Sequence, residues 1–363
     1  MSTGIRKRVF LLSCQIIKRR SCGMKRITTF LIVFTVIGNI LVHTSIINGM
    51  AYAGDEPTIW KCGSTAIISE GVNHPVWQML IFLNEKITAA TEGRYKLELY
   101  HSGQLGGERD TLEGVSNGIY KFGVVMNSYI CNISDVFNVF ELPYLFTSYE
   151  HFLKVLRSDI VTDIGATLES HNLVCLGMGV NGLFSLSNNK LPVTKPEDLQ
   201  NLKIRTMDSP VQIETINFLG GKAIPMNWTE VYTGLQQKTV DGVSAPIAGM
   251  YGSKLYEVQK YATQLRMFVV PSVIIVNKPY WEKLPKEDRE KIQQAVKDAL
   301  ELHFPDALAQ DLDQARRCQE TGKMSVIGPE DYDNNAFIEK VQPIHDKYKD
   351  KYGIWIERIT KMK

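Results

Sequence analysis

The sequence predicts an α/β protein built as two lobes, and two observations carry this prediction. Segments with strand character alternate with segments of helical spacing along most of the chain, which is typical of parallel strands joined by helices. About 310 residues follow a leader-like N-terminus, and this length fits two lobes of ordinary size.

The first predicted elements show this alternation. The stretch "PTIWKCGSTA" (57–66) favours a strand, and "HPVWQMLIFLNEKITAATEG" (74–93) has the spacing of an amphipathic helix. A period-two strand, "RYKLELYHSG" (94–103), comes next. It is followed by a helix, "ERDTLEGVSNG" (108–118), and by a buried strand, "YKFGVVMN" (120–127).

The clearest element signals lie between residues 195 and 246. A short strand over 203–205 ends in Arg205, and Ser209 with Gln212 forms a capping box that starts a helix. This helix is predicted to stop at Gly220. A strand, "KAIPM", a helix capped by Asn227 and a strand, "VDGVSAP", complete the region.

The N-terminus predicts export. Residues 1–53 contain eight Lys or Arg and no Asp or Glu, with an apolar run from Phe30 to Val42 and an A-x-A site at Ala51–Ala53. This pattern indicates a secretory signal peptide over 1–53, with Met24 as an alternative start. An N-terminal membrane anchor is the other interpretation. We expect the mature protein in the periplasm.

The charge of the whole chain comes from this leader. The full chain has 41 basic and 39 acidic residues, and removing the leader leaves a net charge of −6. Such a balance argues against nucleic-acid binding. Four cysteines remain at positions 62, 131, 175 and 318, without zinc-site spacing, and we expect buried thiols, with a single disulfide as the alternative.

Enzyme-like patterns fail in their context. Gly114–Gly118 matches G-x-S-x-G, but a helix precedes the serine and a strand follows it, the reverse of a nucleophile elbow. Gly177–Gly182 matches G-x-G-x-x-G without a helix after it. The histidines form no metal motif. The sequence therefore predicts no enzyme activity, no cofactor and no metal.

Several motifs together resemble one family. The stretches "GQLGGERDTLEGVSNGIYKFGVV", "FELPYLF" and "DLQNLKIRTMDSP…GGKAIPMNWTEVYTGLQQKTVDG" occur in order, and the chain from Pro57 past Glu301 resembles the solute-binding proteins of tripartite ATP-independent periplasmic (TRAP) transporters, of the DctP dicarboxylate type. The resemblance implies a Venus-flytrap fold with a ligand cleft between the lobes and a long hinge-spanning helix. It also implies delivery of the ligand to a TRAP membrane permease.

The resemblance divides the chain into lobes and suggests how it assembles. Lobe I would comprise 54–182 and 271–310, and lobe II 183–270 and 311–363. We expect a monomer. A protein of the same fold that serves a membrane sensor instead of a permease is the alternative.

The resemblance also points to ligand-binding positions. Arg205 matches the arginine that grips the ligand carboxylate, and a guanidinium fork suits that role. Glu108 falls at an acidic cleft position, or it only stabilises a helix N-terminus. Met126 and Asn127 fall where a polar contact is usual, and Trp228 where a ring covers the ligand.

Three further positions complete the predicted cleft. Phe184 replaces a second arginine and Ala245 replaces an asparagine that many members use, while His74 lies at the start of the first helix. Losing two polar partners predicts a monocarboxylate with an apolar or aromatic body, such as a 2-oxo acid. A dicarboxylate or sugar acid is the alternative ligand.

Overall fold

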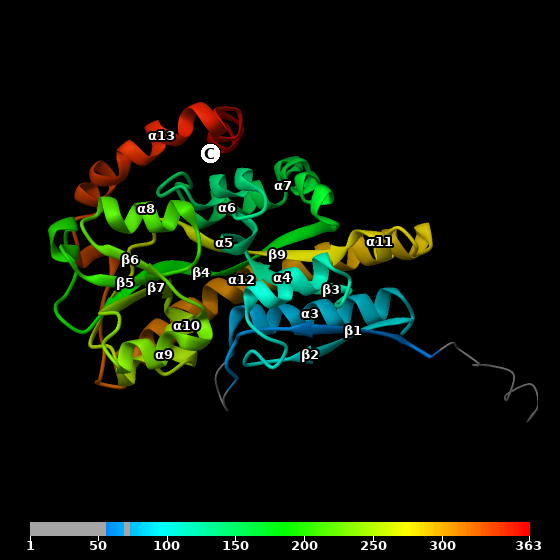
Figure 1. Cartoon of the computed structure of the whole chain (residues 1–363), viewed down its shortest axis with the longest axis horizontal. Helices are drawn as coiled ribbons and strands as arrows, with labels where there is room; N and C mark the ends of the chain where they lie inside the picture. Colours follow the sequence, from blue (N-terminus) through cyan, green and yellow to red (C-terminus); the bar gives the residue numbers. More distant parts are fainter. Residues whose placement is uncertain (1–55, 69–72) are drawn as a thin grey trace, which may run out of the picture. The chain divides into compact units, whose positions relative to one another are not determined.

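The structure is a computed structural model, and it describes residues 56–68 and 73–363. The predicted signal peptide lies outside the described residues. Within them, the mixed α/β fold consists of twisted sheets flanked by helices (Figure 1). Among the described helices, none is long and apolar enough to cross a membrane.

The strands are β1 (Thr58–Gly63), β2 (Tyr95–Tyr100), β3 (Phe122–Met126), β4 (Leu173–Asn188), β5 (Lys203–Thr206), β6 (Lys222–Pro225), β7 (Gly242–Pro246), β8 (Tyr261–Thr263), β9 (Val269–Asn277) and β10 (Ser325–Ile327). The α-helices are α3 (Pro75–Ala90), α4 (Glu108–Ser116), α5 (Asn127–Ile130), α6 (Tyr149–Leu156), α7 (Asp159–Gly165), α8 (Pro210–Phe218), α9 (Trp228–Gln236), α10 (Ile247–Gly252), α11 (Lys278–Trp281), α12 (Lys286–Glu320) and α13 (Asn334–Thr360). Five 3₁₀ helices occur in this part of the chain: η1 (Asp135–Glu141), η2 (Ala166–His171), η3 (Pro196–Leu199), η4 (Leu255–Glu257) and η5 (Pro329–Asp331).

The long strand β4 connects two halves of the fold. Up to Leu183 it pairs with β9, and from Phe184 it pairs with β7 and then β8. We call β1, β2, β3, β9 and the N-terminal part of β4 the first half. The remainder of β4 with β5, β6, β7, β8 and β10 is the second half. The lobe boundaries predicted from the resemblance stay a prediction.

The predicted parallel layering holds for only part of the sheets. β1–β2, β5–β6, β5–β7 and β8–β10 are parallel, but β4 pairs antiparallel with β7, β8 and β9, and β3 with β9. The reason is topological. The chain leaves the first half through β4 and returns to it through β9, so these two connecting strands run in opposite directions.

The helix starts between residues 74 and 228 follow the capping signals. Ser209 accepts a hydrogen bond from the Gln212 amide, and Pro210 stands at the first helical position, as predicted. The predicted capping box is only half formed, because the Gln212 side chain bonds Ser128 and Glu141. Asn227 is the N-cap of α9, although its side chain makes no capping hydrogen bond. His74 is the N-cap of α3, and its Nδ1 accepts from the Val76 amide at 3.3 Å.

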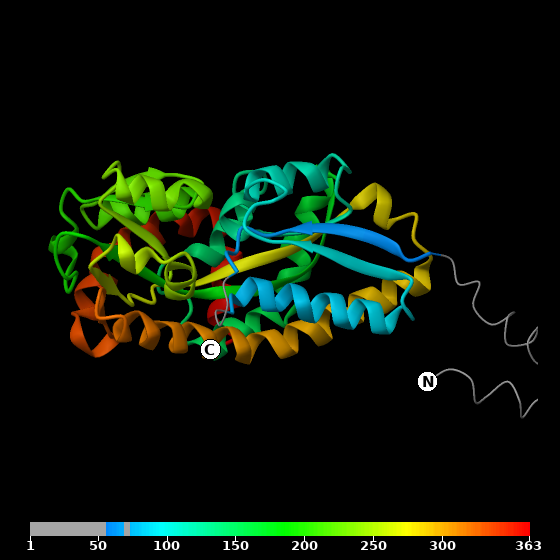
Figure 2. The ribbon, with the colours of Figure 1, turned by 90° about the horizontal axis from the view of Figure 1, so that it is seen from below.

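The 35-residue helix α12 runs along both halves (Figure 2). It contacts α3 and β4 in the first half of the fold, and α10 and β10 in the second half. Its buried positions follow the helical repeat, from Ile292 through Phe304 to Cys318. The helix α12 therefore packs against both halves of the fold.

The two enzyme-like motifs lie in the secondary structure that the sequence predicted for them. The G-x-S-x-G stretch is the end of α4, with β3 after it, and the G-x-G-x-x-G stretch lies inside β4 with no helix following. The four cysteines 62, 131, 175 and 318 are all free, and three of them are buried, so the disulfide alternative is not formed.

The close approach of β4 and β7 requires glycine at position 242. A Cβ built there would overlap the Ser187 carbonyl oxygen, so Gly242→Ala should force the two strands apart and lower the free energy of unfolding by about 1–3 kcal/mol or more. A Cβ at Gly353 in α13 would meet nothing within 4 Å. Gly353→Ala should be neutral or stabilise by about 0.5–1 kcal/mol. Urea unfolding of both variants checks this, and equal effects would contradict the prediction.

Candidate ligand-binding site

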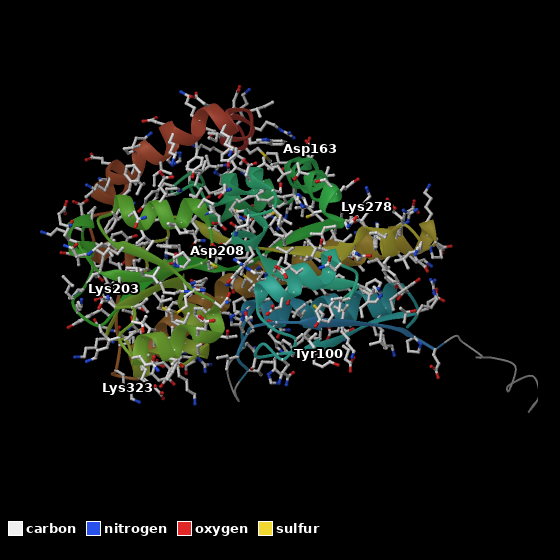
Figure 3. All side chains as sticks on the ribbon, in the orientation of Figure 1. Tyr100, Asp163, Lys203, Asp208, Lys278 and Lys323 are labelled. Carbon is white, nitrogen blue, oxygen red and sulfur yellow. The ribbon has the colours of Figure 1, made fainter. Side chains whose placement is uncertain are left out.

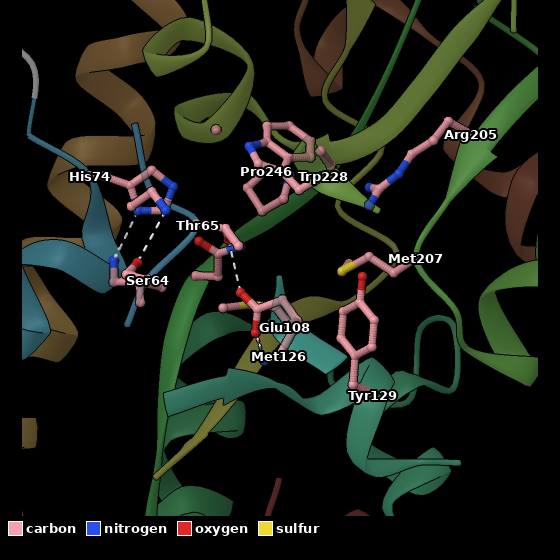
Figure 4. Close-up of a pocket in the computed structure, with 15 residues that line it drawn as sticks. Ser64, Thr65, His74, Glu108, Met126, Tyr129, Arg205, Met207, Trp228 and Pro246 are labelled. Atoms are coloured by element: carbon pink, nitrogen blue, oxygen red, sulfur yellow. Dashed lines mark hydrogen bonds between the residues drawn. The ribbon is translucent and has the colours of Figure 1, made fainter. Parts of the chain in front are cut away.

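A cavity lies where the two halves meet (Figure 4). About 40 Å³ of it is open to the centres of water molecules, inside roughly 520 Å³ of space not filled by atoms. Its lining comprises Ser64, Thr65, Ala66, His74, Val76, Glu108, Met126, Tyr129, Asn181, Arg205, Met207, Trp228, Ala245, Pro246 and Gly249. The lining of this cavity therefore draws on both halves of the fold.

The strands place these residues at one edge. Ser64 follows β1, Met126 ends β3, Arg205 lies in β5, and Pro246 ends β7. The carboxyl ends of strands in open α/β sheets are where ligands bind, because the connecting helices begin there. The site is thus built by the topology, with residues contributed by segments far apart in the sequence.

Arg205 is the central charged group of the site, and it is 1% exposed. Its Nε donates to the Met226 carbonyl at 2.9 Å, and its Nη1 reaches the Ser244 carbonyl at 3.5 Å. Burial lowers the pKa of Arg205 to about 10. No Asp or Glu within 56–68 or 73–363 forms an ion pair with it; its hydrogen bonds go to carbonyl oxygens, and Tyr129 and Glu108 act on its charge without direct contact.

Trp228 covers the guanidinium. The Arg205 carbon Cζ lies 5.3 Å from the Trp228 ring centroid, within the range of a cation–π contact. A Cβ added at Gly249 would lie 3.5 Å from the Trp228 ring, so α10 packs closely behind it. Figure 4 shows the Arg205 side chain directed toward the Tyr129 hydroxyl and the Met207 sulfur. Ring and backbone together fix the orientation of the cation.

Glu108 is a buried carboxylate in the same cavity. Its Oε1 accepts from Thr65 Oγ1 and its Oε2 from the Met126 amide, both at 2.9 Å. Burial raises the pKa of Glu108, and these two hydrogen bonds act in the opposite direction. The carboxylate therefore joins the segment after β1 to the end of β3, and it holds two lining residues in place.

Two further titratable groups face the cavity. Burial lowers the pKa of His74 to about 4, so this ring is neutral near pH 7. Since Nδ1 accepts from the Val76 amide, the ring proton is on Nε2, which is a donor. Burial raises the pKa of Tyr129 to about 12, so its phenol stays protonated. The lining thus presents neutral hydrogen-bonding groups around one cation and one carboxylate.

Polar contacts also join the halves at the surface beside the cavity. Arg109 of α4 forms an ion pair with Asp208, which follows β5 and is labelled in Figure 3. Asn132 Nδ2 donates to the Asp208 carbonyl at 2.7 Å. Both halves are therefore closed over the cavity in this structure.

Six of the eight residues predicted for the site line this cavity, namely Glu108, His74, Met126, Arg205, Trp228 and Ala245. Asn127 and Phe184 lie elsewhere. Asn127 is fully buried, and its Nδ2 donates to the Phe137 carbonyl and to Glu141. Phe184 packs on Phe268 with ring centroids 4.5 Å apart. Alternation in β4 turns the Phe184 side chain into the core.

The sequence did not single out several lining residues. Tyr129 belongs to the one-turn helix α5, and this turn brings the residue three positions after Met126 back to the strand end. A helical turn directly after a buried strand was the available signal. Ser64, Thr65 and Met207 lie in connections, where no periodicity marks them.

No metal chemistry is indicated. In the part of the chain that the structure describes, no group of three or more His, Cys, Asp or Glu side chains could hold a metal ion. The site contains a fixed cation, Arg205, the aromatic face of Trp228 and several neutral hydrogen-bond donors. These groups suit the binding of an organic anion.

Comparison with known proteins also indicates a ligand-binding protein. Residues 68–351 match the DctP family, the bacterial extracellular solute-binding proteins of family 7, and the chain belongs to this family. A solute-binding protein of Chromohalobacter salexigens is 30% identical over 276 residues, which cover 76% of this chain and 81% of that protein. The family consists of solute-binding proteins of TRAP transporters, so this protein is a binding protein and not an enzyme.

Solved structures share the fold. A TRAP periplasmic solute-binding protein from Polaromonas sp. bound to D-erythronate has a TM-score of 0.78 at 27% identity, covering 84% of this chain and 98% of that chain. Another from Anaerococcus prevotii with bound D-glucuronate has a TM-score of 0.78 at 28% identity, with the same coverage. The two-lobed α/β fold expected from the resemblance is therefore confirmed.

The hydrogen bonds of Glu108 predict how substitutions at this position will behave. In Glu108→Gln the amide oxygen can still accept from Met126, and the amide nitrogen can donate to Thr65 Oγ1. In Glu108→Leu the buried Met126 amide loses its partner, which should lower the free energy of unfolding by about 1–3 kcal/mol. Denaturant unfolding should rank the variants wild type, Gln, Leu, and a Leu variant as stable as Gln would refute this.

Proposed function

We propose that this protein captures a small organic monocarboxylate in the periplasm and delivers it to the membrane permease of a TRAP transporter. One observation carries the proposal. Arg205 is a buried guanidinium that lines the cavity, and no carboxylate in the described chain forms an ion pair with it. A buried charge without a counter-charge is costly, so a ligand carboxylate that completes the pair gains a strong interaction.

The charge balance of the lining favours a single carboxylate. Arg205 is the cation among the lining residues, and Glu108 lines the same cavity. A second ligand carboxylate would meet no further Lys or Arg there and would be repelled if it approached Glu108. C4 dicarboxylates should therefore bind more weakly than monocarboxylates of similar size.

The size and polarity of the cavity bear on the rest of the ligand. Only about 40 Å³ of it is open to the centres of water molecules, which limits the ligand that fits this form of the protein to a small one. Tyr129, Asn181, Ser64 and His74 offer polar atoms, while Met126, Ala245 and Pro246 offer apolar surface. These features support a smaller and more polar acid than the apolar or aromatic body that the sequence favours.

A thermal-shift panel tests the proposal. The panel holds L-lactate, D-erythronate, phenylpyruvate, succinate and D-glucuronate, each at equal concentration and pH 7. We expect a small monocarboxylate to raise the unfolding midpoint most, because at equal concentration the ligand with the highest affinity for the folded state stabilises it most. The largest shift with succinate would contradict the monocarboxylate assignment. No shift with any of the five acids would contradict the proposed function.

Arg205→Ala tests the carboxylate clamp directly. Removing one partner of a buried charge pair costs about 2–5 kcal/mol, so the dissociation constant for the best acid of the panel should rise at least ~30-fold in calorimetry. Arg157→Ala is the matched control, because Arg157 pairs with Glu301 on the surface. The control should keep wild-type affinity, and an Arg205→Ala variant that does so as well would disprove the clamp.

A further inference from the structure

A second buried carboxylate, Glu141, lies behind the cavity. It ends η1, is completely buried, and has no ion pair within the described residues. Its Oε1 accepts from Asn127 Nδ2 at 3.0 Å and from Ser128 Oγ at 2.7 Å. Its Oε2 accepts from Gln212 Nε2 at 3.2 Å. Ser209 also bonds it, so four neutral side chains supply its hydrogen bonds.

These donors come from both halves of the fold. Asn127 and Ser128 open α5, which follows β3 of the first half, while Gln212 is in the first turn of α8, which follows β5 of the second half. Gln212 Nε2 also donates to Ser128 Oγ at 2.9 Å. One carboxylate and one hydroxyl therefore connect α5 to α8 through fully buried contacts.

The same two segments carry the walls of the ligand cavity. Met126 immediately precedes α5 and Tyr129 belongs to it, while Arg205 and Met207 lead into α8. Ser128 Oγ lies 3.5 Å from Met207 Sδ, so the hydrogen-bonded group touches a lining residue. A change in the spacing of α5 and α8 would move the opposite walls of the site relative to each other.

We propose that Glu141, through Gln212 and Ser128, is a positioning residue that sets the spacing between the Arg205 segment and the Met126–Tyr129 wall. This inference rests on the proposed binding function. Burial raises the pKa of Glu141, and its neutral donors act in the opposite direction. Because no cation pairs with Glu141, its carboxylate is stabilised by hydrogen-bond donors alone. Losing the Gln212 donor therefore disfavours the packing of α8 against α5, which holds the two walls of the cavity together.

Gln212→Met is the variant of choice. It keeps the side-chain length and removes one of the two contacts that the second half makes with Glu141, while Asn127, Ser128 and Ser209 still bond Glu141. Glu141→Gln is less informative, because the Gln212 amide could rotate to accept from it; the Gln212 Oε1 has no partner in the described structure. Glu214→Gln is the control. It lies on the same helix and loses a contact with Lys347 of α13, outside the Glu141 contacts.

Calorimetry uses whichever acid of the five-member panel binds the wild-type protein most tightly. The dissociation constant should rise about 10-fold in Gln212→Met and stay unchanged in Glu214→Gln. Ser128→Ala should reproduce the loss if Gln212→Met fails to fold. A purely structural role would lower the thermal midpoint and leave the dissociation constant unchanged, and that result would overturn the proposal.

Hydrogen exchange separates this inference from the proposed function. In the ligand-free protein, Gln212→Met should speed amide exchange in both α5 and α8, because the contact couples them. Faster exchange confined to α8 would overturn the inference whether or not any acid binds. Failure of all five acids to bind the wild-type protein, with coupled exchange preserved, would instead refute the binding function.

Discussion

The site depends on one constraint, a positive charge held out of water without an ionic partner of its own. Arg205 is directed by the Met226 carbonyl, which lies between β6 and α9, and covered by Trp228, the first residue of α9. Carbonyl dipoles and a ring face stabilise a guanidinium but do not neutralise it. A ligand carboxylate therefore meets a cation that is already oriented and largely desolvated, which reduces the cost of ordering on binding.

The topology explains why such a cation can face residues from the other half. The chain leaves the first half through β4 and returns to it through β9, so two antiparallel strands connect the halves. Each half contributes the ends of its own strands to the lining of the cavity. The helix α12 contacts both halves and limits how they can move. Closure of such a protein changes the backbone only where the connecting strands pass between the halves. The cavity has its full lining only when the two halves are in contact.

Local signals predicted local structure well, and long-range arrangement poorly. The Ser209 cap and the strand that ends near Arg205 could be predicted because turn and capping chemistry act within four residues. The antiparallel course of β4 could not, since strand direction depends on distant partners. Phe184 was assigned to the cleft by its place in a motif, but the alternation of side chains along β4 decides which face it occupies. Tyr129 was missed because one helical turn sets its direction.

The position of the Glu108 carboxylate in the cavity explains how the Arg205 guanidinium stays available. Glu108 lines the same space as Arg205, and an ion pair between them would occupy the clamp before any ligand arrived. Instead, its two oxygens accept from Thr65 Oγ1 and the Met126 amide, which fix the carboxylate on the first half of the fold. Neutral donors therefore satisfy Glu108 within the first half, and neutral donors from both halves satisfy Glu141 farther from the cavity. Since neither acid forms an ion pair with Arg205, the guanidinium is left for a third group, which under the proposed function is the ligand carboxylate.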